Sequence, residues 1–323
     1  MNEAICASSR QKKSLHIRRG QAICNLVLSN ANEGTSYYIP RPEDDWDALS
    51  SLADDDILHY DNTMGGFFVT HDVYEEIVFL HILSQAYLHK QNVDTLFQAI
   101  GDSLVMRKAF RLWLHHQFED TSNEIVSFLS DTLTQENLNA IWKDEILIAL
   151  MGEDNVKYLL FLDNILKEHD YQLFTRALIL LNTACKTVDI QFWQRILTEE
   201  EIEHHNIYRC TKPSGSGWSY LISYAYTHRA DIPWSPVVIM LTADMLYTWA
   251  NHIHNGKTTR NAGLMSLYLY RLIRESNEYH YQIKSESLEH CFFRHRVKYV
   301  FLAIENSHAV IFPLSSYFLT AGS

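Results

Sequence analysis

The stretch GGFFVTHDVYEE, from Gly65 to Glu76, decides how the first part of this chain is interpreted. Its apolar run FFVT (67–70) follows the turn-rich DNTMGG (61–66), which in turn follows a second short apolar run, ILHY (57–60). Two short apolar runs on either side of a glycine-containing turn predict a β-hairpin. From Val73 onward, apolar residues recur at helical spacing. The stretch therefore predicts a hairpin strand that runs directly into a helix.

Three residues with chemical potential lie at this junction: His71, Asp72 and Glu75. A His and a carboxylate at positions i and i+4 of a helix can share a metal ion or act as an acid–base pair, so one hypothesis is a metal-dependent hydrolase. Such a site needs at least a third ligand, and no H-x-x-x-H pattern or second His-Asp pair lies nearby. The other interpretation is structural: Asp72 caps the helix, and Glu75 completes a capping box at its positive end. The residue pattern favours the structural interpretation.

Two further helices are predicted before the hairpin, in SLHIRRGQAICNLVLSNA (14–31) and in PEDDWDALSSLADDD (42–56). The order helix, helix, hairpin, helix is the outline of a winged-helix unit, which we place at residues 1–90 with its hairpin at about 57–70. Winged helices often bind DNA through the helix before the hairpin. Here that segment carries Glu43, Asp44, Asp45, Asp47, Asp54, Asp55 and Asp56. These carboxylates would be repelled by a phosphate backbone, so the unit is expected to contact protein and not nucleic acid.

The remainder of the chain predicts consecutive helices with short connections, because only 11 Gly and 6 Pro occur in 323 residues. Helical spacing of apolar residues predicts helices at about 73–89, 102–118, 123–134, 137–151, 155–168, 171–185, 189–197, 217–228, 234–254, 260–276 and 285–305. No fixed repeat period is visible. The expected fold is mainly α: a winged-helix-like unit with one β-hairpin, followed by an irregular helical array in two parts, 91–211 and 212–323.

The overall charge excludes several functions. A formal net charge of −12 argues against broad binding to nucleic acids or to anionic membranes.

No apolar window reaches the roughly 18 residues that span a bilayer. Five scattered cysteines without a CxxC pair fit a reducing compartment, so the cytoplasm is the expected location. One local basic cluster, Arg10, Lys12, Lys13, Arg18 and Arg19, is interpreted as a solvated helix face in preference to a phosphate-binding patch.

Two glycine-containing stretches could bind anions. In KPSGSGWSYL (212–221), Lys212 precedes the glycines and Trp218 stands where a phosphate-binding Lys would be expected, so we interpret it as a flexible inter-helix loop with an aromatic anchor. In NGKTTRNAG (255–263), Gly256 is expected to end one helix, and Thr258 or Thr259 to cap the next.

The residues around His71 also resemble a known family. GGFFVTHDVYEEIV is similar to the end of the winged-helix domain of STAND-class signalling NTPases, where a hairpin strand enters a Met-His-Asp or similar triplet that opens an amphipathic helix. Thr70 stands where that family often has Met. Later segments resemble the helical C-terminal sensors of bacterial antiviral-type members, in the expected order: IGDSLVMRKAFRLWLHHQFED (100–120), IWKDEILIALMG (141–152) and IPWSPVVIMLTADMLYTWANHIHNGKTTRNAGLMSLYLYRL (232–272). The resemblance covers roughly residues 15–275.

The resemblance implies a nucleotide-sensing role for His71, which would contact the phosphates of a bound ATP or ADP, with Asp72 as a structural cap. No G-x-x-x-x-G-K-[ST] motif occurs in the chain, so the nucleotide would be held by a missing or separate NTPase domain, and the chain itself is expected not to be an enzyme. The implied partners are that domain and a protein trigger, in a signalling or antiviral defence pathway. Two alternatives stay open: a stand-alone helical protein-interaction scaffold, and a metal-dependent hydrolase using His71, Asp72 and Glu75.

Overall fold

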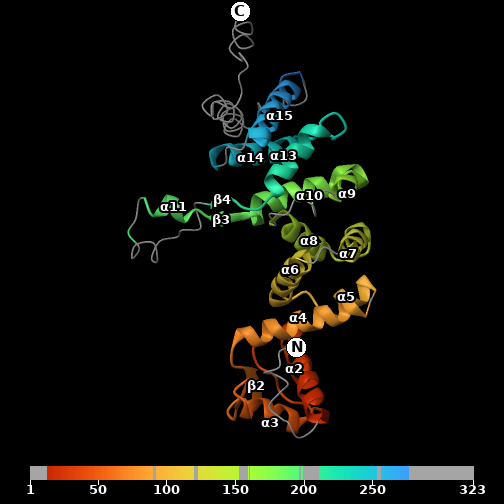
Figure 1. Cartoon of the computed structure of the whole chain (residues 1–323), viewed down its shortest axis with the longest axis vertical. Helices are drawn as coiled ribbons and strands as arrows, with labels where there is room; N and C mark the ends of the chain where they lie inside the picture. Colours follow the sequence, from red (N-terminus) through yellow and green to blue (C-terminus); the bar gives the residue numbers. More distant parts are fainter. Residues whose placement is uncertain are drawn as a thin grey trace, which may run out of the picture. The chain divides into compact units, whose positions relative to one another are not determined.

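The computed structural model describes residues 13–89, 92–119, 123–152, 159, 161–195, 198, 211–252 and 256–275 (Figure 1). The chain divides into two compact units, Met1–Ala149 and Leu150–Ser323. Most of the described residues are helical, and the only sheets among them are two small antiparallel hairpins. The predicted mainly α fold is confirmed. The predicted helix at 285–305 lies outside the described residues.

The first unit begins with the predicted order of elements. Helix α2 (Lys13–Glu33) and helix α3 (Trp46–Asp54) precede strands β1 (Leu58–Asp61) and β2 (Gly66–Val69), and helix α4 (Asp72–Leu88) follows. The two strands pair from Leu58↔Val69 to Asp61↔Gly66, and an isolated bridge from Tyr38 to Phe67 adds one residue on the other side of β2. Helices α3 and α4 both pack on α2. The hairpin and the helix after it therefore form as the sequence predicts.

Local hydrogen bonds explain why these elements start and turn where they do. Asp45 is the N-cap of α3, and its carboxylate accepts a hydrogen bond of 3.1 Å from the amide of Ala48. In the hairpin turn, the Asp61 carboxylate accepts from the amide of Thr63 at 2.7 Å. Gly65 has a φ of +68°, a left-handed conformation that glycine adopts without steric cost. The sequence DNTMGG thus encodes the turn directly.

Among its described residues, the first unit also contains α5 (Val93–Ile100), α6 (Leu104–Glu119), α7 (Asn123–Thr134) and α8 (Ala140–Gly152), and the last residues of α8 belong to the second unit. Helix α5 was not predicted from the sequence. The rings of Phe97, Phe110 and Trp142 form its core contact with α6 and α8, with Phe97 stacked on Trp142 at 4.5 Å between centroids. All three side chains are at most 4% exposed. Aromatic packing of this kind joins these helices.

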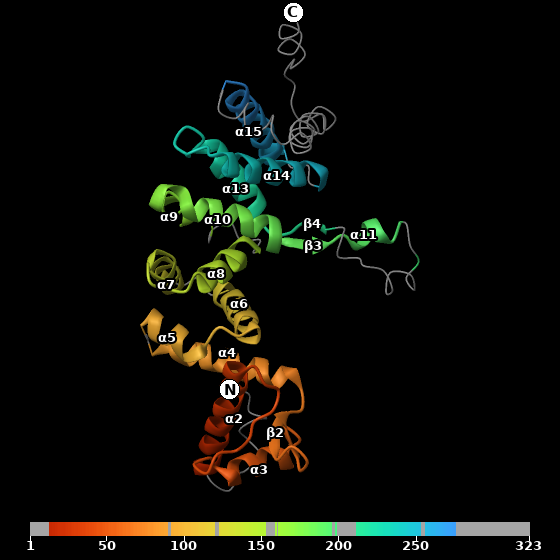
Figure 2. The ribbon, with the colours of Figure 1, turned by 180° about the vertical axis from the view of Figure 1, so that it is seen from behind.

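The second unit contains helices α9 (Leu162–Ile165), α10 (Glu168–Ala184), α11 (Ile190–Trp193), α13 (Gly217–Thr227), α14 (Pro236–His252) and α15 (Gly256–Glu275). Helix α13 packs on α15, and α14 packs on α10 and α15. Strands β3 (Lys186–Val188) and β4 (Thr211–Pro213) form a second antiparallel hairpin. Strand β3 packs on α10 and β4 packs on α14, while α11 extends away from the other helices of its unit in both views (Figures 1 and 2). This second hairpin, within the helical array, was not predicted from the sequence.

A rare backbone conformation precedes most of α10. His169, Asp170 and Tyr171 have φ values of +49°, +54° and +62°, which is one left-handed turn built from three non-glycine residues. Each such residue costs about 1–2 kcal/mol relative to the right-handed form. The side chain of Tyr171 is 8% exposed and contacts Phe174 with ring centroids 6.3 Å apart. Burial of this aromatic side chain offsets part of the cost of the turn.

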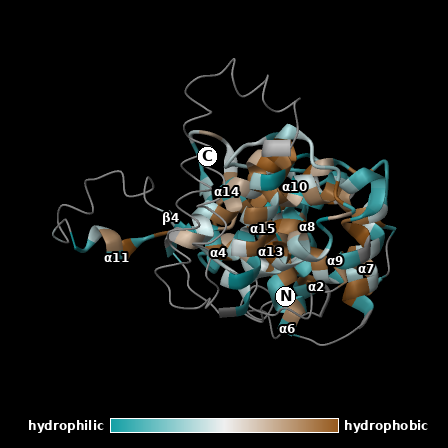
Figure 3. Cartoon of the chain, turned by 90° about the horizontal axis from the view of Figure 1, so that it is seen from above, coloured by the Kyte–Doolittle hydropathy of each residue, from teal (hydrophilic) through white to brown (hydrophobic). Residues whose placement is uncertain are grey.

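Helices of both units carry hydrophobic and hydrophilic residues side by side (Figure 3). This mixture is typical of helices that bury one face and expose the other. In the part of the chain described by the structure, no helix is both long and apolar enough to cross a membrane.

Candidate functional site

The backbone around His71 changes from strand to helix within two residues. The Thr70 amide and hydroxyl donate to the Ile57 carbonyl at 3.1 and 3.2 Å, and the hydroxyl also donates to the Asp56 carbonyl at 2.6 Å. These bonds hold the end of β2 against the residues that precede β1. His71 then has extended backbone angles, φ −140° and ψ 132°, and α4 begins at the next residue. His71 is thus fixed in place by the hairpin, although its side chain is exposed.

The helix cap differs from the prediction by one residue. His71, and not Asp72, is the N-cap of α4, and its side chain makes no capping hydrogen bond. Its carbonyl accepts a hydrogen bond of 2.9 Å from the amide of Tyr74. Asp72 already has the helical conformation, so it cannot be the N-cap of the predicted capping box. The reason is that the backbone stays extended through His71, beyond the end of β2, so the change to helical angles comes after this residue. Asp72 and Glu75 do lie in the first turn of α4, where carboxylates are favoured.

Glu75 is half-buried in this first turn. Burial, and secondarily the charge of Asp72, raises the pKa of the Glu75 carboxyl above its usual value. His71, whose ring centroid lies 5.9 Å from that of Tyr74, is exposed beside it. His71, Asp72 and Glu75 do not converge: among the described residues, no group of three or more His, Cys, Asp or Glu side chains could hold a metal ion. The hydrolase hypothesis therefore has no ligand set in that part of the chain.

The raised pKa of the Glu75 carboxyl leads to a testable prediction about stability and pH. Because its folded-state pKa is raised, this carboxyl favours folding below its ordinary pKa, and that contribution is lost as the pH rises through the folded-state pKa. We expect Glu75→Gln to raise the free energy of unfolding at pH 7 relative to the unmodified chain, with a smaller difference near pH 4. Urea unfolding at the two pH values measures this.

The neighbouring Glu76 provides the control for that experiment, because it is an exposed carboxylate on the same helix. Glu76→Gln removes one charge near the helix start without relieving burial of a carboxylate. If the two variants change stability equally at pH 7, burial of Glu75 has no energetic consequence.

The N-terminal charge clusters pair with each other inside the first unit. Arg18 forms an ion pair of 2.9 Å with Asp45. Arg19 is completely buried; its Nη2 donates to Asp55 Oδ2 at 2.6 Å, and its Nη1 donates to the Ser51 carbonyl at 2.8 Å. The interpretation of the basic cluster as a solvated helix face is thus wrong for Arg19. Its partners lie far away in the sequence, so charge spacing alone did not reveal them.

The glycines of residues 212–221 serve packing. Lys212 lies in β4, where its Nζ is 3.9 Å from Asp189 Oδ1, so the segment begins as a strand and not as the expected flexible loop. A Cβ atom on Gly215, which has a φ of +81°, would meet the Met151 carbonyl oxygen at 2.3 Å. One on Gly217 would meet the Met151 Cβ at 2.5 Å. Glycine is therefore required here by close backbone approach, and Trp218 is the buried aromatic anchor that the sequence predicts.

The basic turn at 255–263 also differs in detail from the prediction. Helix α15 begins at Gly256, so Thr258 and Thr259 lie inside its first turns and are 6% and 3% exposed. They pack inside the unit instead of capping the helix. Residue 255 lies outside the described residues.

A further buried charge cluster joins α6 to α8. Glu145 is buried, with Arg111 Nε at 2.8 Å and Arg107 Nη1 at 4.0 Å from its carboxylate oxygens. Burial raises the pKa of Glu145, and the two guanidinium groups act in the opposite direction. The carboxylate is covered, whereas the Arg107 and Arg111 side chains are 30% and 33% exposed, and these ion pairs between α6 and α8 fit a structural role.

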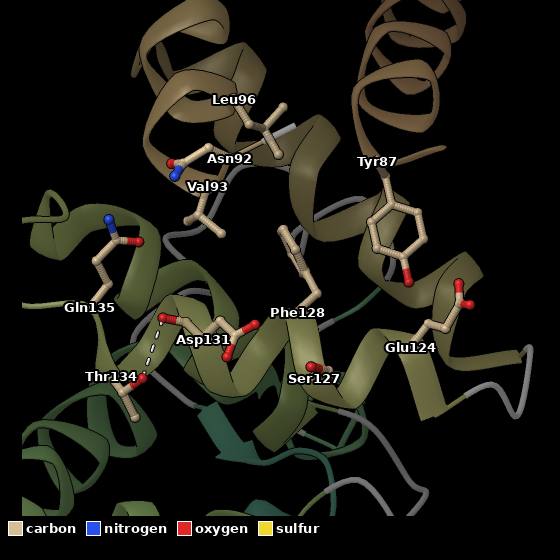
Figure 4. Close-up of a pocket in the computed structure, with 10 residues that line it drawn as sticks. All are labelled: Tyr87, Asn92, Val93, Leu96, Glu124, Ser127, Phe128, Asp131, Thr134 and Gln135. Atoms are coloured by element: carbon tan, nitrogen blue, oxygen red, sulfur yellow. Dashed lines mark hydrogen bonds between the residues drawn. The ribbon is translucent and has the colours of Figure 1, made fainter. Parts of the chain in front are cut away.

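One groove was not predicted from the sequence. It has a volume of about 660 Å³ and is lined by Tyr87, Asn92, Val93, Leu96, Glu124, Ser127, Phe128, Asp131, Thr134 and Gln135 (Figure 4). Its lining comes from α5, α7 and the end of α4. The exposed α7 residues of the groove recur at helical spacing. In the sequence, however, this pattern looks the same as that of an ordinary solvated helix face.

The described residues define a mainly helical class of protein with two small antiparallel hairpins. No protein-family model matches the chain, and no curated protein matches it.

Proposed function

We propose that this chain is a non-catalytic regulatory module that couples recognition of a protein trigger to the nucleotide state of a STAND-like NTPase domain. The winged-helix-like unit would contact the NTPase domain, and His71 would contact the phosphates of its ATP or ADP. The helices that follow would bind the trigger. The sequence resemblance around His71 motivates this proposal, and the exposure of the same junction supports it.

The observation that carries the proposal is an uncovered surface at the start of α4. His71 is exposed, its side chain makes no capping hydrogen bond, and the neighbouring Val73 is 57% exposed. An apolar side chain this exposed beside a polar one is compatible with contact to another protein surface. The positive end of a 17-residue helix favours an anion here.

The first experiment identifies what contacts this surface. A photocrosslinking amino acid is placed at Val73 in cells, and the crosslinked protein is identified by mass spectrometry. The matched control position is Leu88 at the other end of the same helix, which is 68% exposed. We expect a crosslink from position 73 to a protein with a Walker-type NTPase domain and none from position 88. A position-73 partner without such a domain would contradict the proposal and favour the stand-alone scaffold.

The second experiment tests His71 itself in the purified complex with that NTPase. His71→Ala should weaken binding of a fluorescent ADP analogue by about tenfold, because it removes a hydrogen bond to a charged group. His89→Ala, at the C-cap of α4, is the matched control, since it is an exposed His on the same helix. Fluorescence titration measures both affinities. Equal affinities for the unmodified and His71→Ala complexes would remove the sensing role.

A further inference from the structure

The groove beside α7 has a floor and a rim of different chemistry (Figure 4). Val93 and Leu96 of α5 line one side, and Phe128 of α7 projects into the groove from the other. The Phe128 ring also meets Tyr87 edge-on, with centroids 5.6 Å apart. Phe128 and Tyr87 are only partly covered by the unit. The floor of the groove is therefore apolar and aromatic.

The rim of the groove is acidic. Glu124, Ser127 and Asp131 occupy successive turns along one face of α7, and all three are exposed. The carboxylates of Glu124 and Asp131 form no ion pair with any residue that the structure describes, and no basic residue lines the groove. Two carboxylates above an apolar floor are complementary to a ligand that carries both positive charge and apolar groups.

We propose that this groove binds a basic amphipathic peptide segment of a partner protein. Lys or Arg side chains of the segment pair with Glu124 and Asp131, while an apolar side chain between them contacts Val93, Leu96 and Phe128. Seven residues along a helix place Glu124 and Asp131 about 10 Å apart. In a polyproline II segment, with three residues per turn and about 3.1 Å per residue, this distance corresponds to basic residues spaced three apart on one face. The inference rests on the proposed function in one respect: it takes the partner protein to be the trigger, and it gives that trigger a chemical class.

A defined peptide tests this chemistry on the full chain. The probe is a short, dye-labelled peptide of Lys-Leu-Ser repeats, whose lysines recur every third residue, and fluorescence anisotropy measures its affinity. A peptide of the same composition with its lysines in one block tests spacing, and a Glu-Leu-Ser peptide tests charge. We expect the Lys-Leu-Ser peptide to bind more tightly than either control, and its binding to weaken with added salt. Failure of the Lys-Leu-Ser peptide to bind, or equal binding of the three peptides, would overturn the proposal.

Matched substitutions locate the binding. Ser127→Lys places a positive charge in the groove and should weaken the peptide affinity by about tenfold or more. Ser50→Lys makes the same change at an exposed position of α3 in the same unit and should change the affinity by less than about threefold. Both serines are exposed and helical, so neither variant disturbs the core. Equal weakening by the two variants would mean general attraction to a negatively charged chain and would overturn the site.

A second pair separates the rim carboxylates from net charge. Glu124→Gln with Asp131→Asn should weaken binding, whereas Asp47→Asn with Asp54→Asn, an exposed pair at the same spacing on α3, should not. Spermidine serves as a competitor without apolar side chains. If spermidine binds as tightly as the peptide, and if Ser127→Lys abolishes spermidine binding, the groove is a site for small cations. The peptide proposal is then wrong. None of these measurements involves nucleotide or His71, so their outcome is independent of the ADP experiment.

Discussion

Replacing Trp218 with alanine should lower the free energy of unfolding of the second unit by about 3–5 kcal/mol. The Trp218 side chain is fully buried, and its Nε1 donates a hydrogen bond of 2.8 Å to the Cys185 carbonyl. The substitution removes a large apolar side chain and one of two hydrogen bonds to that carbonyl, which still accepts from the Ser214 amide at 3.1 Å. Lys186 also loses a cation–π contact, because its Nζ lies 5.8 Å from the centroid of the Trp218 ring. Hydrogen-exchange mass spectrometry in urea, followed on peptides from α10 and α13, measures the loss within this unit.

Two further variants separate the parts of this effect. Trp218→Phe keeps most of the apolar volume but loses the hydrogen bond, so it should cost about 1–3 kcal/mol. Phe192→Ala truncates an aromatic side chain of the same unit that is 40% exposed, and it should cost less than about 1 kcal/mol. If Trp218→Ala and Phe192→Ala were equally destabilising, Trp218 would not be the anchor of this unit.

Replacing Arg19 with alanine should destabilise the first unit by about 2–5 kcal/mol, because it removes a completely buried side chain and its hydrogen bonds. The guanidinium joins α2 to the Ser51 carbonyl and to Asp55 at the end of α3. Without it, a cavity forms and the Ser51 carbonyl loses a donor. The Asp55 side chain is 31% exposed, so water hydrates its carboxylate when the guanidinium is removed. This hydration keeps the destabilisation within that range. Exchange protection of α2 and α3 peptides measures the change.

The adjacent residue Arg18 is the matched control. It also pairs with an aspartate, Asp45, but its side chain is 42% exposed, so Arg18→Ala should cost less than about 1 kcal/mol. A double-mutant cycle of Arg19→Ala with Asp55→Asn should give a coupling energy of at least about 0.5 kcal/mol. Strict additivity of the two substitutions would show that the ion pair is not energetically coupled.

Periodicity and turn chemistry were enough to place several elements. Helix α7 begins and ends at the predicted residues 123 and 134, and the first hairpin lies within one residue of its prediction. Both rest on local signals: apolar residues at helical spacing in the first case, and the Asp61 and Gly65 turn residues in the second. The N-cap of α4 lies one residue away from its prediction, because both His71 and Asp72 are compatible with that position until the strand end is fixed by Thr70.

The second hairpin could not be predicted in the same way. Strands β3 and β4 have three residues each, and Thr187 pairs with Lys212 across a long connection. Three residues are too few to show the alternation of an amphipathic strand. The left-handed turn at His169, Asp170 and Tyr171 carries no glycine, so the usual sequence sign of positive φ is missing as well.

Of the candidate residues, the sequence by itself determined that His71, Asp72 and Glu75 stand where a hairpin strand becomes a helix. Only the tertiary structure decided that His71 is exposed, that Glu75 is half-buried and that these side chains do not converge on a metal site. It also decided that Arg19 is buried against Ser51 and Asp55, and that α4, α5 and α7 together line an acidic groove. The physical reason is the same in each case. Secondary structure follows from spacing along the chain, whereas burial and grooves depend on which distant segments pack together.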